Sequence, residues 1–288
     1  MAGLTAEQVQ RYRDDGYLLV EGVFDPSVAD ELKAELSSRV DTFAHSAHGE
    51  GRLRDLHGDE LFPTRMARIA EEMVDPADGL RQLNGKLRTK GMFRILTEPS
   101  LVDIVESVIG PEILAHPQFN VRAKLPNQDS TVVPWHQDLG YLQPDAEETF
   151  MVNFWIPLVD ATQENGCLEV IAGSHRTPLF EHEHGLGPGG NFKGIRDEHL
   201  PDGKQVLCPV REGGVLLIQH KTFHRSLPNT SQHIRWSLDL RYSDPDMPTG
   251  RAGVPGFIAR SGRDPESVCA SAVGWNRIVD AAGTPAGS

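Results

Sequence analysis

The fold of this chain is decided by a short apolar run, Gly214-Val215-Leu216-Leu217-Ile218-Gln219-His220. The run is bounded by turn residues and is too short for a helix, which is typical of a buried strand. Short strands that follow one another without intervening helices predict an antiparallel sandwich or barrel. Working outward from this run, similar segments rich in β-branched and aromatic residues are Ile113–Leu125, Val132–His136, Phe150–Pro157, Cys167–Ile171, Gln205–Arg211 and His233–Tyr242.

The first third of the chain has a helical pattern instead. Thr5 and Gln8 form a capping-box pattern in front of a short helix, and Tyr17–Val20 is predicted to be a strand. Apolar residues at helical spacing predict a helix within Asp25–Val40 and another at Leu101–Ile109. We expect these helices to lie against the outside of the sheet.

Three stretches are predicted to be irregular. Residues 43–63 are polar and are predicted to form a loop, whereas the glycine-rich stretch Arg176–Gly203 is typical of a lid or a binding loop. The segment after Asp244 is rich in Pro, Gly and Ser and is predicted to be loose. Without internal repeats, the chain is expected to be a single domain over residues 1–288. Its parts are a helical region at about 1–111, a β core at about 112–243 and a tail at about 244–288.

The charge of the chain limits its partners. Lys and Arg total 28 and Asp and Glu total 41, so the formal net charge is −13. Such a surface repels phosphate backbones and anionic lipids, so no nucleic acid and no membrane is expected as a partner. The apolar runs are far shorter than the ~20 residues of a membrane span, and the N-terminus lacks the apolar region of a signal peptide. Three cysteines are too few for a disulfide framework. We therefore expect a cytoplasmic protein, a monomer or homodimer, that acts on a small molecule.

The tetrapeptide Trp135-His136-Gln137-Asp138 is the first candidate for chemistry. On a strand, side chains two residues apart point to the same face, so His136 and Asp138 would enter one space together. An imidazole and a carboxylate can supply two of the three protein ligands of an octahedral metal. A site with two histidines and one carboxylate leaves the other three coordination positions of the metal open, which suits iron-dependent oxygen chemistry. A His–Asp pair on the surface is the alternative interpretation of this motif alone. The third ligand must come from another strand.

A second segment supplies that ligand. The apolar strand continues to His224, a Pro228-Asn229 turn follows, and Arg235-Trp236-Ser237 begins eleven residues after His224. The order His-x-Asp, His-x-Ser-x-x-Asn-x-Ser and Arg-x-Ser resembles the iron(II)/2-oxoglutarate dioxygenases, and among them the phytanoyl-CoA dioxygenase family. The linking stretch, from Asn153-Phe154-Trp155 to Gly173-Ser174-His175, is also similar to that family.

The resemblance implies a fold and a set of roles. The fold is a double-stranded β-helix, a jelly roll like that of the cupins, with flanking helices. His136, Asp138 and His224 become the catalytic iron ligands. Arg235 becomes the partner of the distal carboxylate of 2-oxoglutarate, with Ser237 as a second donor. Two further contacts of 2-oxoglutarate are expected at Trp155 and Asn120. An arginine suits this role because its guanidinium binds a carboxylate through two parallel hydrogen bonds.

The resemblance also implies the reaction. Iron(II) is the cofactor, 2-oxoglutarate and O2 are co-substrates, and succinate and CO2 are released as an aliphatic C–H bond of a small metabolite is hydroxylated. The presence of Asp138 disfavours halogenation, because related halogenases have a small residue there. Desaturation, cyclisation or epimerisation by the same iron centre remains an alternative, as does a cupin-like protein that only binds a metal or ligand. By analogy with the family, the substrate is expected to be apolar or polycyclic, and its selection is expected to involve residues 43–63 and Arg176–Gly203.

Overall fold

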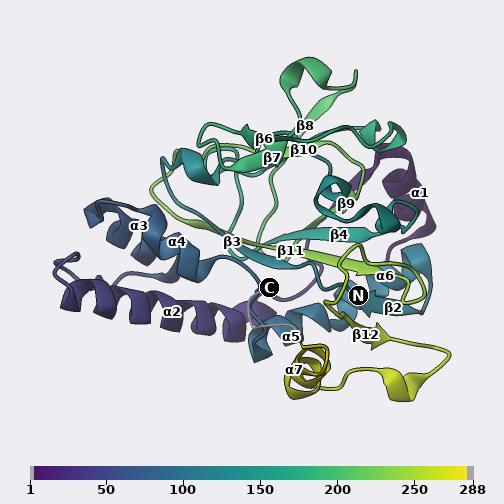
Figure 1. The fold of residues 1–288 in the computed structure, drawn as a ribbon, viewed down its shortest axis with the longest axis horizontal. Helices are drawn as coiled ribbons and strands as arrows, with labels where there is room; N and C mark the ends of the chain where they lie inside the picture. Colours follow the sequence, from purple (N-terminus) through teal and green to yellow (C-terminus); the bar gives the residue numbers. More distant parts are fainter. Residues whose placement is uncertain (1–2, 284–288) are drawn as a thin grey trace.

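The computed structural model describes residues 3–283, which form two facing antiparallel sheets with helices on one side (Figure 1). The larger sheet has seven strands in the order β1-β9-β4-β11-β2-β12, and β3 also pairs with β11. The smaller sheet has the order β10-β5-β8, and β6 and β7 form a separate hairpin. This arrangement confirms the predicted fold class, a mainly β, cupin-like jelly roll with flanking helices.

The strands are β1 Tyr17–Val20, β2 Ile113–Ala115, β3 Asn120–Lys124, β4 Val152–Pro157, β5 Leu168–Ile171, β6 Glu183–Leu186, β7 Phe192–Gly194, β8 Gln205–Cys208, β9 Val215–Gln219, β10 His224–Ser226, β11 Arg235–Ser243 and β12 Phe257–Arg260. The helices are α1 Ala6–Asp15, α2 Asp30–Gly49, α3 Phe62–Glu72, α4 Ala77–Leu83, α5 Lys90–Leu96, α6 Pro99–Ile109 and α7 Ala272–Ala281. The helices α2, α5 and α7 lie below the larger sheet in Figure 1, and the smaller sheet lies above it.

Strand β11 shows how the sequence separates the two faces of the larger sheet. Alternate residues of a strand point to opposite faces. One set is apolar and belongs to the core between the sheet and the helices: Trp236, Leu238, Leu240 and Tyr242. The other set is polar and faces the smaller sheet: Arg235, Ser237, Asp239 and Arg241. The strand is therefore buried along almost all its length and still presents charged side chains to an interior space.

The N-terminal predictions hold in detail. The side chain of Thr5 accepts a hydrogen bond from the backbone N–H of Gln8, and the side chain of Gln8 accepts one from the backbone N–H of Thr5, so the capping box forms. The helix that it begins ends at Gly16, whose φ of 79° suits a residue without a Cβ. The strand Tyr17–Val20 forms as predicted and pairs with β9.

Several predicted boundaries are wrong. Helix α2 extends to Gly49 and α3 begins at Phe62, so only the middle of residues 43–63 is irregular. The stretch Arg176–Gly203 contains the β6–β7 hairpin. Val132–His136 forms no ladder: within this segment His136 alone makes a β-bridge, to His224.

The predicted loose tail is also incorrect for most of its length. Strand β12 adds to the larger sheet beside β2, and helix α7 buries Trp275 and Val279 in the main core. Trp275 packs against Phe257, with ring centroids 5.3 Å apart. Aromatic burial of this kind outweighs the local Pro and Gly content. The last part of the predicted tail, residues 284–288, lies outside the described residues.

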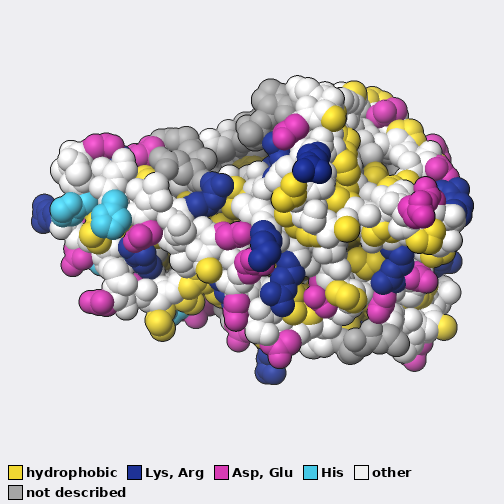
Figure 2. Space-filling view, turned by 90° about the horizontal axis from the view of Figure 1, so that it is seen from below, with side chains coloured by type: hydrophobic (Ala, Val, Ile, Leu, Met, Phe, Trp, Pro, Cys, Tyr) yellow, Lys and Arg dark blue, Asp and Glu magenta, His cyan; other side chains and the backbone are white. Residues whose placement is uncertain are grey.

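The helical side of the molecule presents charges of both signs (Figure 2). Figure 2 shows the helical side, where acidic and basic side chains are interspersed with small apolar areas. None of the helices within residues 3–283 combines the length and the apolar character that crossing a bilayer requires.

Candidate metal and co-substrate site

The two histidines of the candidate metal site meet through the backbone. The N–H of His136 donates to the carbonyl of His224, and the N–H of His224 donates back, both at 3.0 Å. The imidazole centroids are 4.1 Å apart. Asp138 does not continue the extended chain, because a 3-10 turn, Asp138–Tyr141, begins there. The expectation that His136 and Asp138 share one strand is thus wrong, although their side chains still enter the same space.

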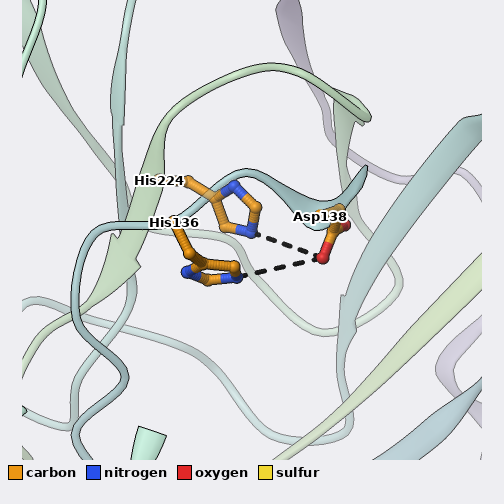
Figure 3. Close-up of side chains that lie close together, drawn as sticks. All are labelled: His136, Asp138 and His224. Carbon is orange, nitrogen blue, oxygen red and sulfur yellow. Dashed lines mark ion pairs between the residues drawn. The ribbon is translucent and has the colours of Figure 1, made fainter. Parts of the chain in front are cut away.

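The three side chains converge on one point, as Figure 3 shows. Asp138 Oδ1 lies 3.8 Å from His136 Nε2 and 4.0 Å from His224 Nε2. The three candidate ligand atoms all lie within 4.8 Å of one another. Bonds of about 2 Å to nitrogen and oxygen allow one ion to bridge donors at such separations. Two imidazoles and one carboxylate on one side of an ion are the donor set that non-haem iron(II) oxygenases use.

Hydrogen bonds fix the histidines with the correct nitrogen inward. Nδ1 of His136 lies 2.9 Å from the carbonyl oxygen of Pro134, and Nδ1 of His224 lies 2.9 Å from that of Thr222. A carbonyl oxygen only accepts, so each Nδ1 carries the proton and each Nε2 offers a lone pair to a metal. Burial, together with the nearby His224, lowers the pKa of His136 to about 3. This imidazole is therefore neutral and ready to bind a metal at physiological pH.

Asp138 is held by two side chains from the larger sheet. Arg241 donates from Nη2 to Oδ1 at 2.6 Å, and Asn153 donates from Nδ2 to Oδ2 at 2.7 Å. Arg241 and Asn153 are cross-strand neighbours on β11 and β4. Burial alone would raise the pKa of Asp138, but the charge of Arg241 and its hydrogen bond hold that pKa below its usual value. The carboxylate is thus ionised and oriented before any metal binds.

Arg235 occupies the predicted position for a carboxylate partner. Its side chain is 3% exposed, Nη1 donates to Ser237 Oγ, and its guanidinium carbon lies 5.0 Å from the ring centroid of Trp155. Its Nε is buried without a partner among the described residues. Burial lowers the pKa of Arg235 to about 10, which still leaves it charged. A buried cation with unused donors and no acidic partner in the described chain fits the distal carboxylate of 2-oxoglutarate.

The alternative for Arg235, an ordinary pair with Asp239, does not occur in the structure. Asp239 instead accepts a hydrogen bond from Nε of Arg122, at 2.9 Å. Asn120, the least direct of the predicted contacts, lies opposite Asp239 on β3 but is not among the residues that line the cavity. The contact of Asn120 with 2-oxoglutarate therefore stays a prediction.

The triad and Arg235 open into one cavity of about 610 Å³. Its floor is formed by β3, β4 and β11, and it also reaches Ser237 and Trp155. Of the two segments expected to select substrate, Arg176–Gly203 contributes Asn191 and Phe192 to the wall. Residues 43–63 contribute nothing to it: α2 lies on the opposite side of the larger sheet (Figure 1), and Phe62 at the start of α3 stacks on Trp236, whose side chain belongs to the core on that side.

Sequence reasoning missed three supporting residues. Arg241 shares the alternating polar face of β11 with Arg235, so strand periodicity could have indicated it. Asn153 needs the β4–β11 register, which the sequence does not contain. His182, in the stretch Arg176–Gly203, is 8% exposed, and its Nε2 accepts the backbone N–H of Gln137, which lies between two of the candidate ligands.

Comparison with known proteins places this site in a family. The sequence model described as "Phytanoyl-CoA dioxygenase (PhyH)" matches residues 12–237. Phytanoyl-CoA dioxygenase domain-containing protein 1 of Danio rerio is 30% identical over 263 residues, which cover 81% of this chain and 87% of the relative. The peroxisomal phytanoyl-CoA dioxygenase of Homo sapiens is 24% identical, covering 84% of this chain and 69% of the relative.

Solved structures share the fold. The non-heme monooxygenase ThoJ has a TM-score of 0.61 at 18% identity and covers 95% of each chain. The non-heme alpha ketoglutarate dependent epimerase SnoN from nogalamycin biosynthesis has a TM-score of 0.53 at 22% identity, covering 85% of this chain and 86% of its own. At these identities the likeness establishes the jelly-roll architecture alone.

Proposed function

This chain belongs to the phytanoyl-CoA dioxygenase family, and on that premise we propose that it hydroxylates an aliphatic C–H bond of a small organic metabolite. It is a non-haem iron enzyme that depends on 2-oxoglutarate. One observation carries the proposal: three converging ligand atoms line the same cavity as a buried arginine, Arg235, that has no acidic partner among the described residues.

His136, Asp138 and His224 would hold the iron through two Nε2 atoms and one carboxylate oxygen. When bound, iron(II) with 2-oxoglutarate and O2 supplies an oxidation strong enough for an unactivated C–H bond, with succinate and CO2 as by-products. The protein contributes orientation. The carbonyls of Pro134 and Thr222 hold the two rings, and Arg241 with Asn153 holds the carboxylate. Supporting hydrogen bonds of this kind change metal affinity by about 10–100-fold when they are removed.

Arg235, Ser237 and Trp155 would bind the far end of 2-oxoglutarate. A dicarboxylate that leaves water loses its hydration, so it needs a fixed cation at the buried end of the cavity. Arg235 is fixed there by Ser237 and by the face of the Trp155 ring. Asp239 and Arg122 line the same cavity, which would also hold the primary substrate.

The test is turnover of 2-oxoglutarate. Purified protein that has been reconstituted anaerobically with iron(II) is expected to release succinate when 2-oxoglutarate and air are added, and more of it when a candidate metabolite is present. Product mass then decides the outcome, since hydroxylation adds one oxygen atom whereas desaturation or ring closure removes two hydrogens. The His224→Ala variant, which lacks one ligand, is the matched control. Wild-type protein that forms no more succinate than this variant would contradict the proposal.

Two further expectations are part of the proposal. A cytoplasmic location and a monomeric or homodimeric working state are proposed. Size-exclusion chromatography with light scattering checks the latter.

A further inference from the structure

We propose that Arg122 and Asp239 together recognise an uncharged hydrogen-bonding group, a hydroxyl or an amide, on the primary substrate. The inference rests on the proposed function, because it assigns the substrate class of the same cavity. Arg122 belongs to β3 and Asp239 to β11, and both line the cavity that contains the triad. Nε of Arg122 donates to Oδ2 of Asp239 at 2.9 Å.

Along β11 the pair lies between the residues assigned to the two ends of the co-substrate. On the cavity face of β11, Asp239 follows Arg235 by four residues and precedes Arg241 by two. At about 3.3 Å per residue, its backbone is about 13 Å from that of Arg235 and about 7 Å from that of Arg241, which binds Asp138. The pair therefore lies nearer the metal ligands than the proposed partner of the distal carboxylate.

The hydrogen-bonding capacity of the pair is largely unused. The side chain of Arg122 is 45% accessible and that of Asp239 30%, although both line the cavity. Within residues 3–283, Arg122 makes one side-chain hydrogen bond, through Nε, so that both Nη groups remain available. The carboxylate of Asp239 likewise accepts one, at Oδ2, and its Oδ1 remains available. The pair thus presents several N–H donors and one acceptor to whatever fills the cavity.

Neither stability nor the co-substrate explains this pair. An accessible ion pair contributes little to folding, and apolar side chains at these positions would pack the space between the sheets better. Arg235 and Ser237 already serve the distal carboxylate, and Arg241 and Asn153 already hold Asp138. Recognition of the remaining occupant, the primary substrate, is the role left for the pair.

The charges of the pair select the class of group. Because the guanidinium and the carboxylate cancel, the pair suits a group that both accepts and donates hydrogen bonds. Arg122 would attract a substrate carboxylate, but Oδ1 of Asp239 would repel it. Asp239 would attract a substrate ammonium group, but Arg122 would repel it. Amide and hydroxyl side chains of Asn84, Thr131 and Asn191 also line this cavity. The substrate is therefore an oxygenated, polar molecule, which revises the apolar class expected from family analogy.

The test uses three matched six-membered rings: trans-1,2-cyclohexanediol, cyclohexanecarboxylate and cyclohexylammonium. Binding is measured through the relaxation of the ring protons by the paramagnetic metal, with anaerobic enzyme that holds iron(II) and 2-oxoglutarate. We expect the wild type to bind the diol most tightly. Arg122→Met is expected to weaken the diol about tenfold, the lower end of the effect of one charge-assisted hydrogen bond. The dissociation constant of 2-oxoglutarate is expected to differ by less than about twofold between Arg122→Met and the wild type. If Arg122 made a charge-assisted hydrogen bond to 2-oxoglutarate, the substitution would raise that constant at least about tenfold.

Two more variants make the result decisive. Asp239→Asn keeps the shape but removes the negative charge, so cyclohexanecarboxylate should bind to it more tightly than to the wild type. Arg68→Met removes a comparably exposed arginine that pairs with Glu71 on the same helix, outside the cavity, and it should change none of the three affinities.

Tightest wild-type binding of the carboxylate, or a diol affinity that Arg122→Met and Asp239→Asn both leave unchanged, would overturn the inference. Succinate release by the same preparations in air separates this failure from failure of the proposed function, which would abolish turnover in the wild type.

Discussion

Replacing Arg235 by alanine should weaken the binding of 2-oxoglutarate specifically through its distal carboxylate. The guanidinium is 3% exposed, has one hydrogen bond to Ser237 and keeps Nε unused, so the carboxylate would take over donors that have no other partner in the described chain. A hydrogen bond between charged groups contributes about 1.5–3 kcal/mol. The dissociation constant of 2-oxoglutarate should therefore rise about 10–150-fold in Arg235→Ala.

Calorimetric titration of the anaerobic iron(II) enzyme measures this effect, and 2-oxobutyrate provides the control. That keto acid binds a metal in the same way but lacks the distal carboxylate, so the variant and the wild type should bind it equally. Arg235→Lys keeps the charge but loses the two-pronged geometry, and should fall between the two. If Arg235→Ala weakens both keto acids equally, or neither of them, the assignment of Arg235 is wrong.

Three other perturbations test the surroundings of the site. Asp138→Asn should lose iron affinity and keep its fold. Asp138→Ala should lose iron affinity too, and its free energy of unfolding should fall by about 3 kcal/mol, because this variant leaves Arg241 buried without its partner. Denaturant titration of the two metal-free variants distinguishes them. Burial and the charge of Arg235 lower the pKa of Lys124 to about 6, and a bound dicarboxylate favours the charged form of this amine. The contribution of Lys124 to 2-oxoglutarate affinity should therefore be complete below about pH 6, and it should be lost as the pH rises through the higher pKa that the amine has in the complex. Lys124→Met should flatten this pH profile in calorimetric titrations. In Gly140→Ala the new Cβ would lie 2.3 Å from the ring of His182, which supports the segment between two of the ligands. Iron affinity, measured by competition with a chelator, should therefore fall about tenfold. Unchanged affinity would mean that His182 does not position the ligands.

The sequence predicts the sheets better than their surroundings, for a physical reason. A strand such as Val215–Gln219 has its apolar side chains within a few consecutive residues, so its pattern is local. Helix α7 is stable because Trp275 packs against Phe93, Phe119 and Phe257, contacts that no local window contains. Its Pro- and Gly-rich approach therefore misled the prediction.

The same distinction applies to the site. His136, Asp138, His224 and Arg235 could be identified because their order and spacing in the chain carry the pattern. The residues that orient them depend on register. Asn153 reaches Asp138 only because it lies opposite Arg241 across β4 and β11, and a shift of one residue would turn it toward the helices.

The charges on the cavity floor explain why an acidic protein keeps cations in its interior. Arg241 is balanced by Asp138 and Arg122 by Asp239. Among the residues that the structure describes, Arg235 and Lys124 have no such carboxylate, and they are cross-strand neighbours in β11 and β3. Burial beside Arg235 lowers the pKa of the Lys124 amine to about 6, so this amine is neutral at pH 7 until a bound anion favours its charged form. On the proposed placement, a dicarboxylate at this end of the cavity would balance Arg235 and the charged form of Lys124, and the neutral Arg122–Asp239 pair would meet the primary substrate. Substrate charge should therefore matter less to this enzyme than substrate hydroxyl or amide groups.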